Sequence, residues 1–315
     1  MKVTVWGARG SVPAPGPETN RYGGNTSCVH VRLDDGSELV LDAGTGIRSL
    51  GLAMTTTAER IHILLTHLHM DHIQGLMFFA PLFQATTDVV IYGPASPEAS
   101  LMDRIARYIS APLSPVEVRE LPCQVSFRDA PDIEWQIGSA SVRANSVAHR
   151  GPTLGYRITE GDTSLAYIPD HEPALGAPLD ALEDEWISGY ALANDASLLV
   201  HDSQYTDAEY PAHVGWGHSR ITDTLAFARR VGAQRLALFH HDPMHEDDML
   251  DEFVTDAAER WTRLGCDAGQ IAIARERHAL EFPVATSSAT KSARLQSVPR
   301  GVTHEPAYAA PVTTE

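Results

Sequence analysis

Three histidines and an aspartate crowd together near the start of the chain, and their types suit metal binding. Residues 67–72 read His-Leu-His-Met-Asp-His and directly follow a short apolar run. In an extended chain His67 and His69 point the same way, because side chains repeat every two residues, so both could bind one ion. Asp71 and His72 follow after a turn and could face a second ion. Imidazole and carboxylate groups are ligands of zinc and related divalent metals.

The elements around this segment indicate how it is positioned. Residues 61–65 read as a buried strand, because they are apolar, rich in β-branched side chains and end abruptly in polar residues. Residues 73–80 read as the start of a helix. The histidine segment then follows the carboxyl end of a strand, where open α/β sheets place their sites. The alternative, a polar loop of solvated histidines, is disfavoured because four clustered ligands are costly to desolvate without a cation.

The same arrangement recurs three times further along the chain. A predicted buried strand ends one or two residues before each of His149, Asp170 and His240. We therefore expect these side chains to meet the histidine segment at one rim of the fold. Taken alone, each residue could play a different part: His149 could lie in an exposed turn, Asp170 could cap a helix, and His240 competes with His241 for one role.

The remaining pattern predicts several strands, a helix, more strands and more helices. Residues 43–47, rich in glycine and alanine, are expected to allow close approach to a bound group. The expected strands cover residues 2–6, 28–33, 38–42, 88–92, 132–137, 140–147, 154–159, 163–168, 197–201, 235–239 and 271–281, and the expected helices cover residues 97–109, 219–231 and 246–264.

Through these residues the chain resembles the metallo-β-lactamase-fold hydrolases over about residues 1–282. Residues 146–158, 167–170 and 238–243 resemble the family's third ligand motif, its bridging-aspartate motif and its last ligand motif. The resemblance implies an α/β chain folded as a four-layer αββα sandwich, with two divalent metal ions, zinc first and manganese or iron as alternatives. It implies that His67, His69 and His149 bind one ion, that Asp71, His72 and His240 bind the other, and that Asp170 bridges them.

The chain is most similar to the ribonuclease Z-like and cyclic-phosphodiesterase branch of that family. Residues 198–205 and 215–220 resemble later motifs of the branch. In it, the histidine of the Gly-His-Ser/Thr segment lies beside the metals and contacts the scissile phosphate, a role that falls to His218 here. The alternative is an ordinary histidine at a helix N-terminus, with Ser219 as the cap.

Five further side chains are weaker candidates for the neighbourhood of the metals. His201 and Asp202 could orient a metal-binding histidine from behind. Arg9 and Ser11 lie in a Gly- and Pro-rich loop, where the guanidinium could approach an anion or simply face solvent. His241 remains a candidate beside the preferred His240.

The charge of the chain and one short spacing narrow the substrate. The net charge is −17, with 41 acidic against 24 basic residues, and a surplus of acid disfavours binding to long nucleic acids. The resemblance implies that tRNA-processing members carry a long arm between the third histidine and the bridging aspartate. Here these residues, 149 and 170, lie only 21 positions apart, as in relatives that act on cyclic phosphates. A small anionic phosphodiester is therefore the predicted substrate.

The composition also predicts domain organisation and location. Residues 1–283 are expected to form the hydrolase domain, and residues 284–315, rich in Ser, Thr, Ala and Pro, a disordered tail. The three cysteines have no metal-type spacing, the first residues read as a strand rather than a signal peptide, and no apolar run reaches the ~20 residues of a membrane helix. We therefore expect a cytoplasmic protein without a membrane partner, and the family resemblance allows a homodimer.

These observations predict a dinuclear metal-dependent phosphodiesterase that works through a hydroxide bridging its two ions. Asp71 would bind metal and orient that hydroxide, and His218 would stabilise developing charge or protonate the leaving oxygen. The first alternative is a hydrolase of lactones, thioesters or similar carbonyl esters, since the same metals polarise a carbonyl. The second is a non-catalytic metal-binding or scaffold module, which the full set of candidate ligands disfavours.

Overall fold

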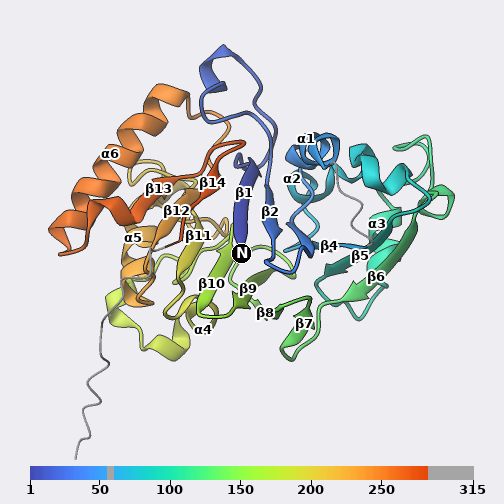
Figure 1. The fold of residues 1–315 in the computed structure, drawn as a ribbon. Coiled ribbons are helices and arrows are strands. Elements are labelled where there is room, and N and C mark those ends of the chain that lie inside the picture. The colour runs from blue at the N-terminus through green and yellow to red at the C-terminus, as the bar shows by residue number, and fades with distance from the viewer. Residues whose placement is uncertain (55–59, 283–315) are drawn as a thin grey trace, which may run out of the picture. The chain divides into compact units, whose positions relative to one another are not determined.

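A first mixed sheet organises the N-terminal part of the chain (Figure 1). The computed structural model describes residues 1–54 and 60–282, so the predicted tail lies outside the described residues. Strands β3 to β6 run parallel to one another, which brings their carboxyl ends to the same edge. The seven strands follow the spatial order β14 (Ala279–Leu280), β1 (Lys2–Gly7), β2 (Cys28–Arg32), β3 (Glu38–Leu41), β4 (Arg60–Leu64), β5 (Asp88–Gly93) and β6 (Gln124–Asp129).

A second mixed sheet continues with the C-terminal strands. Strands β10 to β13 are parallel, whereas β7, β8, β9 and β10 pair antiparallel. The carboxyl ends of β10, β11 and β12 therefore also share one edge. The spatial order is β13 (Ile271–Ile273), β12 (Leu236–Phe239), β11 (Leu198–Asp202), β10 (Thr163–Ile168), β9 (Leu154–Glu160), β8 (Ala140–Ser146) and β7 (Trp135–Ile137).

Helices cover the outer face of each sheet. On the first sheet lie α1 (Gly46–Ala53), α2 (Met70–Ile73) and α3 (Leu101–Ala106). On the second lie α4 (Tyr190–Ala193), α5 (Ile221–Arg230) and α6 (Asp247–Arg263), as Figure 1 shows. Short 3-10 helices occupy Pro17–Thr19, Leu76–Phe78, Ala80–Phe83, Val118–Glu120, Leu179–Ala181, Asp184–Trp186, Tyr210–Ala212 and Ala268–Gln270.

The apolar core lies between the two sheets. Alternate residues of each strand face inward, and this core contains Val5, Val31 and Leu41 from the first sheet and Tyr167 and Phe239 from the second. Each is 0% exposed, and burying a side chain of this size contributes about 1.5–3 kcal/mol. With helices outside both sheets, the predicted four-layer αββα sandwich is confirmed.

Two local predictions differ from the structure, and one stays a prediction. Residues 43–47 lead into α1, and a Cβ at Gly44 would lie 2.3 Å from the carbonyl oxygen of Asp71, so this backbone lies close to the histidine segment. Its close approach to a bound group stays a prediction. The helix expected at residues 73–80 starts earlier, as α2, and ends at Ile73. The chain then turns at Gly75, which lies directly against the carbonyl of Gly44. Strand β6 lies outside the predicted strands, since none of its residues is fully buried and its apolar signal is weak.

The described residues also bear on location. Within residues 1–54 and 60–282, no helix is long and apolar enough to cross a bilayer. Cys28, Cys123 and Cys266 are free thiols. Location in the cytoplasm stays a prediction.

Removing the Phe239 ring should destabilise the whole fold. Phe239 is fully buried and packs edge-on against Tyr167, with ring centroids 5.7 Å apart. Phe239→Ala should lower the free energy of unfolding by about 3–5 kcal/mol, measured by urea denaturation followed by circular dichroism. Phe78, which is 63% exposed, is the matched control, and Phe78→Ala should change it by less than about 0.5 kcal/mol. Equal losses in both variants would contradict this assignment of the core.

Candidate metal centre

The ends of four strands bring the predicted ligands together. His67 follows β4, His149 lies in the loop between β8 and β9, Asp170 follows β10 and His240 follows β12. The two sheets are tied together at this edge, where the Tyr156 hydroxyl donates to the Leu65 carbonyl at 2.7 Å. Four segments far apart in the sequence thus meet where the parallel strands of both sheets end.

The ligand atoms form two groups that meet at one carboxylate. The three-histidine group consists of His67, His69 and His149, and the carboxylate group consists of Asp71, His72, Asp170 and His240; the ligand atoms of each lie within 4.8 Å of one another. Asp170 Oδ2 lies 3.7 Å from Nε2 of both His67 and His149 and 3.3 Å from Nε2 of His240. Asp170 Oδ1 lies 3.1 Å from His72 Nε2. This carboxylate therefore has an oxygen in reach of each group.

Burial has the largest effect on the pKa values of the three-histidine group. Burial lowers the pKa values of His67, His69 and His149, although the Asp170 carboxylate acts in the opposite direction. The neutral imidazole is the form that binds metals. These three side chains are therefore in the ligating form at neutral pH.

Negative charge dominates the carboxylate group. Burial opposes the charged form of its histidines, but Asp170, followed by Asp71, raises the pKa of His72 well above its ordinary value. The same two carboxylates raise the pKa of His240 to about 9. The nearby imidazoles in turn outweigh burial and lower the pKa values of both aspartates. Positive charge is thus required between these carboxylates, and a divalent cation can supply it in place of protons.

Unpaired buried atoms show that the residues fit metal ions. His67 Nε2, His72 Nε2 and Asp170 Oδ1 are buried and make no hydrogen bond to any part of the chain that the structure describes. A buried polar atom without a partner costs about 1–3 kcal/mol. Nitrogen and carboxylate oxygen atoms are the donors that zinc takes in catalytic sites. This donor set therefore suits zinc or a similar divalent ion in each group.

A second layer of side chains and carbonyls orients the ligand histidines. His149 Nδ1 donates to the Gly217 carbonyl at 2.7 Å, and His240 Nδ1 donates to Gln204 Oε1 at 3.1 Å. His67 Nδ1 donates to Thr66 Oγ1 at 3.0 Å. Each bond occupies Nδ1 and leaves Nε2 for the centre, which is how ligand histidines are usually held. None of these three partners was among the predicted site residues.

Asp42 is a further site residue, and it was not predicted from the sequence. It directly follows β3, is fully buried, and has one oxygen 2.9 Å from His72 Nδ1. Its carboxylate also accepts hydrogen bonds from the Thr66 backbone at 2.7 Å and the Tyr167 hydroxyl at 2.9 Å. The signal was present, since Asp42 follows a buried strand just as His67 and Asp170 do. Asp42 thus connects both sheets to the carboxylate group.

Two residues of the centre have left-handed backbones. Asp42 has φ of 59° and His240 has φ of 61°. Such conformations of residues other than glycine cost about 1–3 kcal/mol each and gather at functional sites. The surrounding contacts keep both residues in this strained backbone conformation, which a turn without such contacts would not retain.

His218 lies beside both groups, and Asp202 orients it. The His218 ring centroid is 4.8 Å from that of His149 and 4.9 Å from that of His240. His218 Nδ1 donates to Asp202 Oδ2 at 2.7 Å. Asp202 was predicted to support a metal-binding histidine, but in the structure it holds His218 instead. Ser219 does not cap a helix, because its hydroxyl donates to the His171 carbonyl and α5 begins at Ile221.

Four of the weaker candidates play different parts. The guanidinium of Arg9 is fully buried and donates to the backbone carbonyls of Gly23, Asp242 and His245, so it stabilises loops rather than facing an anion in the centre. His201 Nε2 contacts His171 Nδ1 at 2.8 Å, and His241 Nε2 donates to the Ala274 carbonyl at 2.9 Å. Ser11 does reach the centre, where its backbone N–H donates to Asp71 Oδ2 at 2.7 Å.

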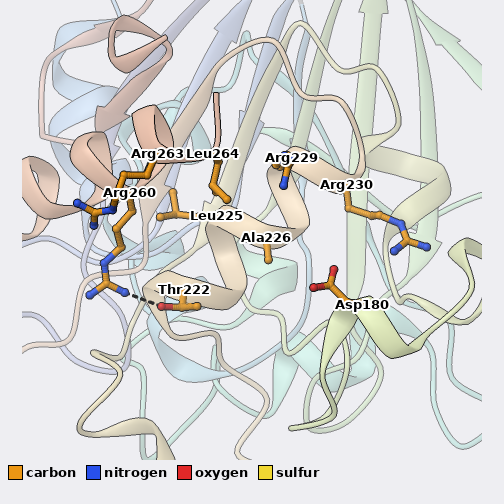
Figure 2. Close-up of a pocket in the computed structure, with 9 residues that line it drawn as sticks. All are labelled: Asp180, Thr222, Leu225, Ala226, Arg229, Arg230, Arg260, Arg263 and Leu264. Atoms are coloured by element: carbon orange, nitrogen blue, oxygen red, sulfur yellow. Dashed lines mark hydrogen bonds between the residues drawn. The ribbon is translucent and has the colours of Figure 1, made fainter. Parts of the chain in front are cut away.

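A cavity opens directly over the candidate centre. It has a volume of about 460 Å³ and is lined by Ser11, Leu68, His69, Met70, Asp71, Asp170, His218 and His240. A larger groove of about 540 Å³ lies between α5 and α6 (Figure 2) and has no lining residue in common with it. The groove contains four arginines, but Arg230 pairs with Asp184, and Arg260 pairs with Asp207. The cavity over the ligand groups is therefore the candidate substrate site.

Comparisons with known proteins agree with this geometry. Residues 38–241 match the family described as beta-lactamase superfamily domain. The ribonuclease Z of Haloarcula marismortui is 26% identical over 90% of this chain and 98% of its own length. That of Myxococcus xanthus is 27% identical over 78% of this chain and 89% of its own.

Solved structures show the same fold. The metallo-β-lactamase fold protein YhfI from Bacillus subtilis aligns with a TM-score of 0.64 at 18% identity, over 89% of this chain and 98% of that one. The short form of human tRNase Z aligns with a TM-score of 0.60 at 22% identity, over 90% of this chain and all of that one. A diphosphatase from the PhnP family gives 0.61 at 18% identity, over 90% and 98% of the two chains. With its two sheets, its strand-end histidines and the family match, this chain belongs to the β-lactamase superfamily and has the metallo-β-lactamase fold.

Proposed function

We propose that this protein is a dinuclear metal-dependent hydrolase of small or cyclic phosphodiesters. The observation that supports it most is the pairing of the three-histidine group with the carboxylate group through Asp170, whose two oxygens reach both. Relatives of the chain that are named as ribonuclease Z, an enzyme of phosphodiester bonds, support the reaction class.

The chemistry needs two cations and several residues of this chain. Two bound divalent ions would lower the pKa of a water molecule to about 7 and polarise phosphoryl oxygens. His67, His69 and His149 would hold one ion, Asp71, His72 and His240 the other, and Asp170 would contact both. Such an arrangement matches the ligand types that catalytic zinc sites use.

Asp71 and His218 would act on protons in the reaction. Ser11 donates its backbone N–H to Asp71 Oδ2, which orients this carboxylate to accept a hydrogen bond from the attacking water. His218 lines the cavity, and its Nδ1 is occupied by Asp202. Because Asp202 occupies Nδ1, His218 Nε2 is left on the cavity side, where it would donate a proton to the leaving oxygen.

The segment between His149 and Asp170 supports a small substrate. It consists of a turn followed by β9 and β10, which are paired within the second sheet. Most of its residues therefore belong to paired strands, and the turns between them are too short to form a substrate-gripping arm. The charge of −17 also disfavours long nucleic acids. Cleavage of RNA is the second candidate, and the names of the relatives favour it. A homodimer stays a prediction from family resemblance.

Metal content and substrate range test the proposal together. Protein loaded with Zn²⁺ or Mn²⁺ should contain about two equivalents per chain by elemental analysis. It should hydrolyse bis-p-nitrophenyl phosphate and 2′,3′- or 3′,5′-cyclic nucleotides. His69→Ala should lose metal and turnover, whereas His278→Ala, an exposed histidine outside the centre, should keep both. Metal-loaded protein that opens lactones or thioesters but no phosphodiester would favour the carbonyl-ester alternative, and protein that binds no metal would favour the scaffold alternative.

His218→Ala separates proton transfer from metal binding. Loss of a general acid lowers rates by about 10²–10⁴-fold, so kcat should fall by that factor for a substrate with a poor leaving group. The fall should be smaller for bis-p-nitrophenyl phosphate, whose leaving group needs little protonation. Metal content, measured in the same preparation, should stay at the wild-type value. A variant that loses one metal equivalent would show that His218 is a ligand instead.

A further inference from the structure

Glu172 is a buried carboxylate close to the candidate centre that the proposed mechanism does not use. It lies two positions after Asp170, and its side chain is almost fully buried. Its oxygens accept the Tyr210 hydroxyl at 2.7 Å, the Gly215 N–H at 2.9 Å and the Gly217 N–H at 2.8 Å. Since a buried carboxylate is costly unless hydrogen-bonded, these three donors account for its presence.

Two of the three donors belong to one tight turn. Gly215 has φ of 80° and Gly217 has φ of 89°, conformations that glycine adopts without strain. The N–H groups of both point to the Glu172 carboxylate. The turn is therefore fixed from one side by a single side chain.

The same turn contacts two residues of the candidate centre. The Gly217 carbonyl accepts the hydrogen bond of His149 Nδ1 at 2.7 Å, and the next residue along the chain is His218. A Cβ on Gly217 would lie 2.5 Å from His149 Nδ1, so the turn lies directly against this ring. The backbone N–H of Glu172 also donates to the Ala148 carbonyl at 2.9 Å, beside His149.

We propose that Glu172 is a positioning residue of the metal centre, and this inference rests on the proposed function. By fixing the Gly215–Gly217 turn, Glu172 places the carbonyl that keeps the His149 ring in the Nδ1–H tautomer, with Nε2 free for a metal. It also sets the backbone from which His218 enters the cavity. Its influence falls on the three-histidine group, because His240 and His72 are oriented by Gln204 and Asp42 instead.

A carboxylate that merely stabilised a surface loop would act differently. It would affect unfolding but not one metal more than the other. Asp202, which accepts the hydrogen bond of His218 Nδ1, would still orient that ring after loss of Glu172. The difference in affinity between the two metals is therefore the measurement that distinguishes the two roles.

The test compares Glu172→Ala with Glu172→Gln in the full-length protein. Zn²⁺ dissociation is followed by titration with a competing chelator, without reference to any substrate. In Glu172→Ala one of the two ions should bind about 10–100-fold more weakly, the range found when the outer partner of a ligand histidine is lost, while the other keeps wild-type affinity. Glu172→Gln should restore most of the loss, because its carbonyl oxygen can accept both glycine N–H groups while its NH₂ donates to Tyr210.

Two further variants serve as controls. Glu209→Ala removes a carboxylate of the same region that accepts the Thr206 N–H at 2.8 Å but does not bond to the 215–217 turn, and both ions should bind as in wild type. If Glu172→Ala does not fold, Gly217→Ala tests the contact between the turn and His149, because the added Cβ would displace the His149 ring. It should lower the affinity for the same ion.

The outcomes separate this inference from the proposed function. Two ions bound with wild-type affinity in Glu172→Ala, or in Gly217→Ala where only that variant folds, would overturn the inference and leave the proposed function standing. Equal weakening of both ions, or no rescue by Glu172→Gln, would also overturn it. A wild-type protein that binds no metal would remove both.

Discussion

The structure depends on the concentration of carboxylates and imidazoles in one buried cluster. Asp170 is buried among four imidazoles, and Asp71 and Asp42 lie next to the same rings. Burial alone would drive protons onto carboxylates and off histidines. The pKa values of Asp71 and Asp170 are instead lowered and those of His72 and His240 raised, because each type of group stabilises the charged form of the other. The chain can hold such a cluster only when cations or protons balance it.

Parallel strands are what make this concentration of charge attainable. At the ends of parallel strands, side chains and free backbone groups reach one edge of the sheet. The peptide groups within the strands stay paired by hydrogen bonds. The two sheets bring two such edges together, and the Tyr156 and Tyr167 hydroxyls cross between them to the Leu65 carbonyl and to Asp42. The apolar core thus fixes the distance between ligands that come from opposite halves of the chain.

The sequence predicts site residues that stand close together along the chain. It does not predict those whose role depends on contacts with distant residues. His67, His69, Asp71 and His72 stand in one short segment, and a solvated loop rarely gathers four metal-binding side chains at that spacing. Gln204 and Gly217 are not metal-binding residue types, and their roles arise only from contacts with residues 36 and 68 positions away. The role of Arg9 was left open between an anion and the solvent for the same reason, since its partners Asp242 and His245 are more than 200 positions distant. In the fold, the strongly apolar strands were predictable, whereas β6 at a sheet edge was not.

The division of ligands between the sheets has a consequence for how the molecule matures. Neither half of the chain carries a complete set, because Asp170, His149 and His240 reside on the second sheet and the remaining donors on the first. Tight binding of the proposed ions would consequently require that the two halves of the chain have already docked. Mass action would then draw the population toward the assembled form as the ion becomes abundant, so cellular metal supply would govern how much intact protein accumulates.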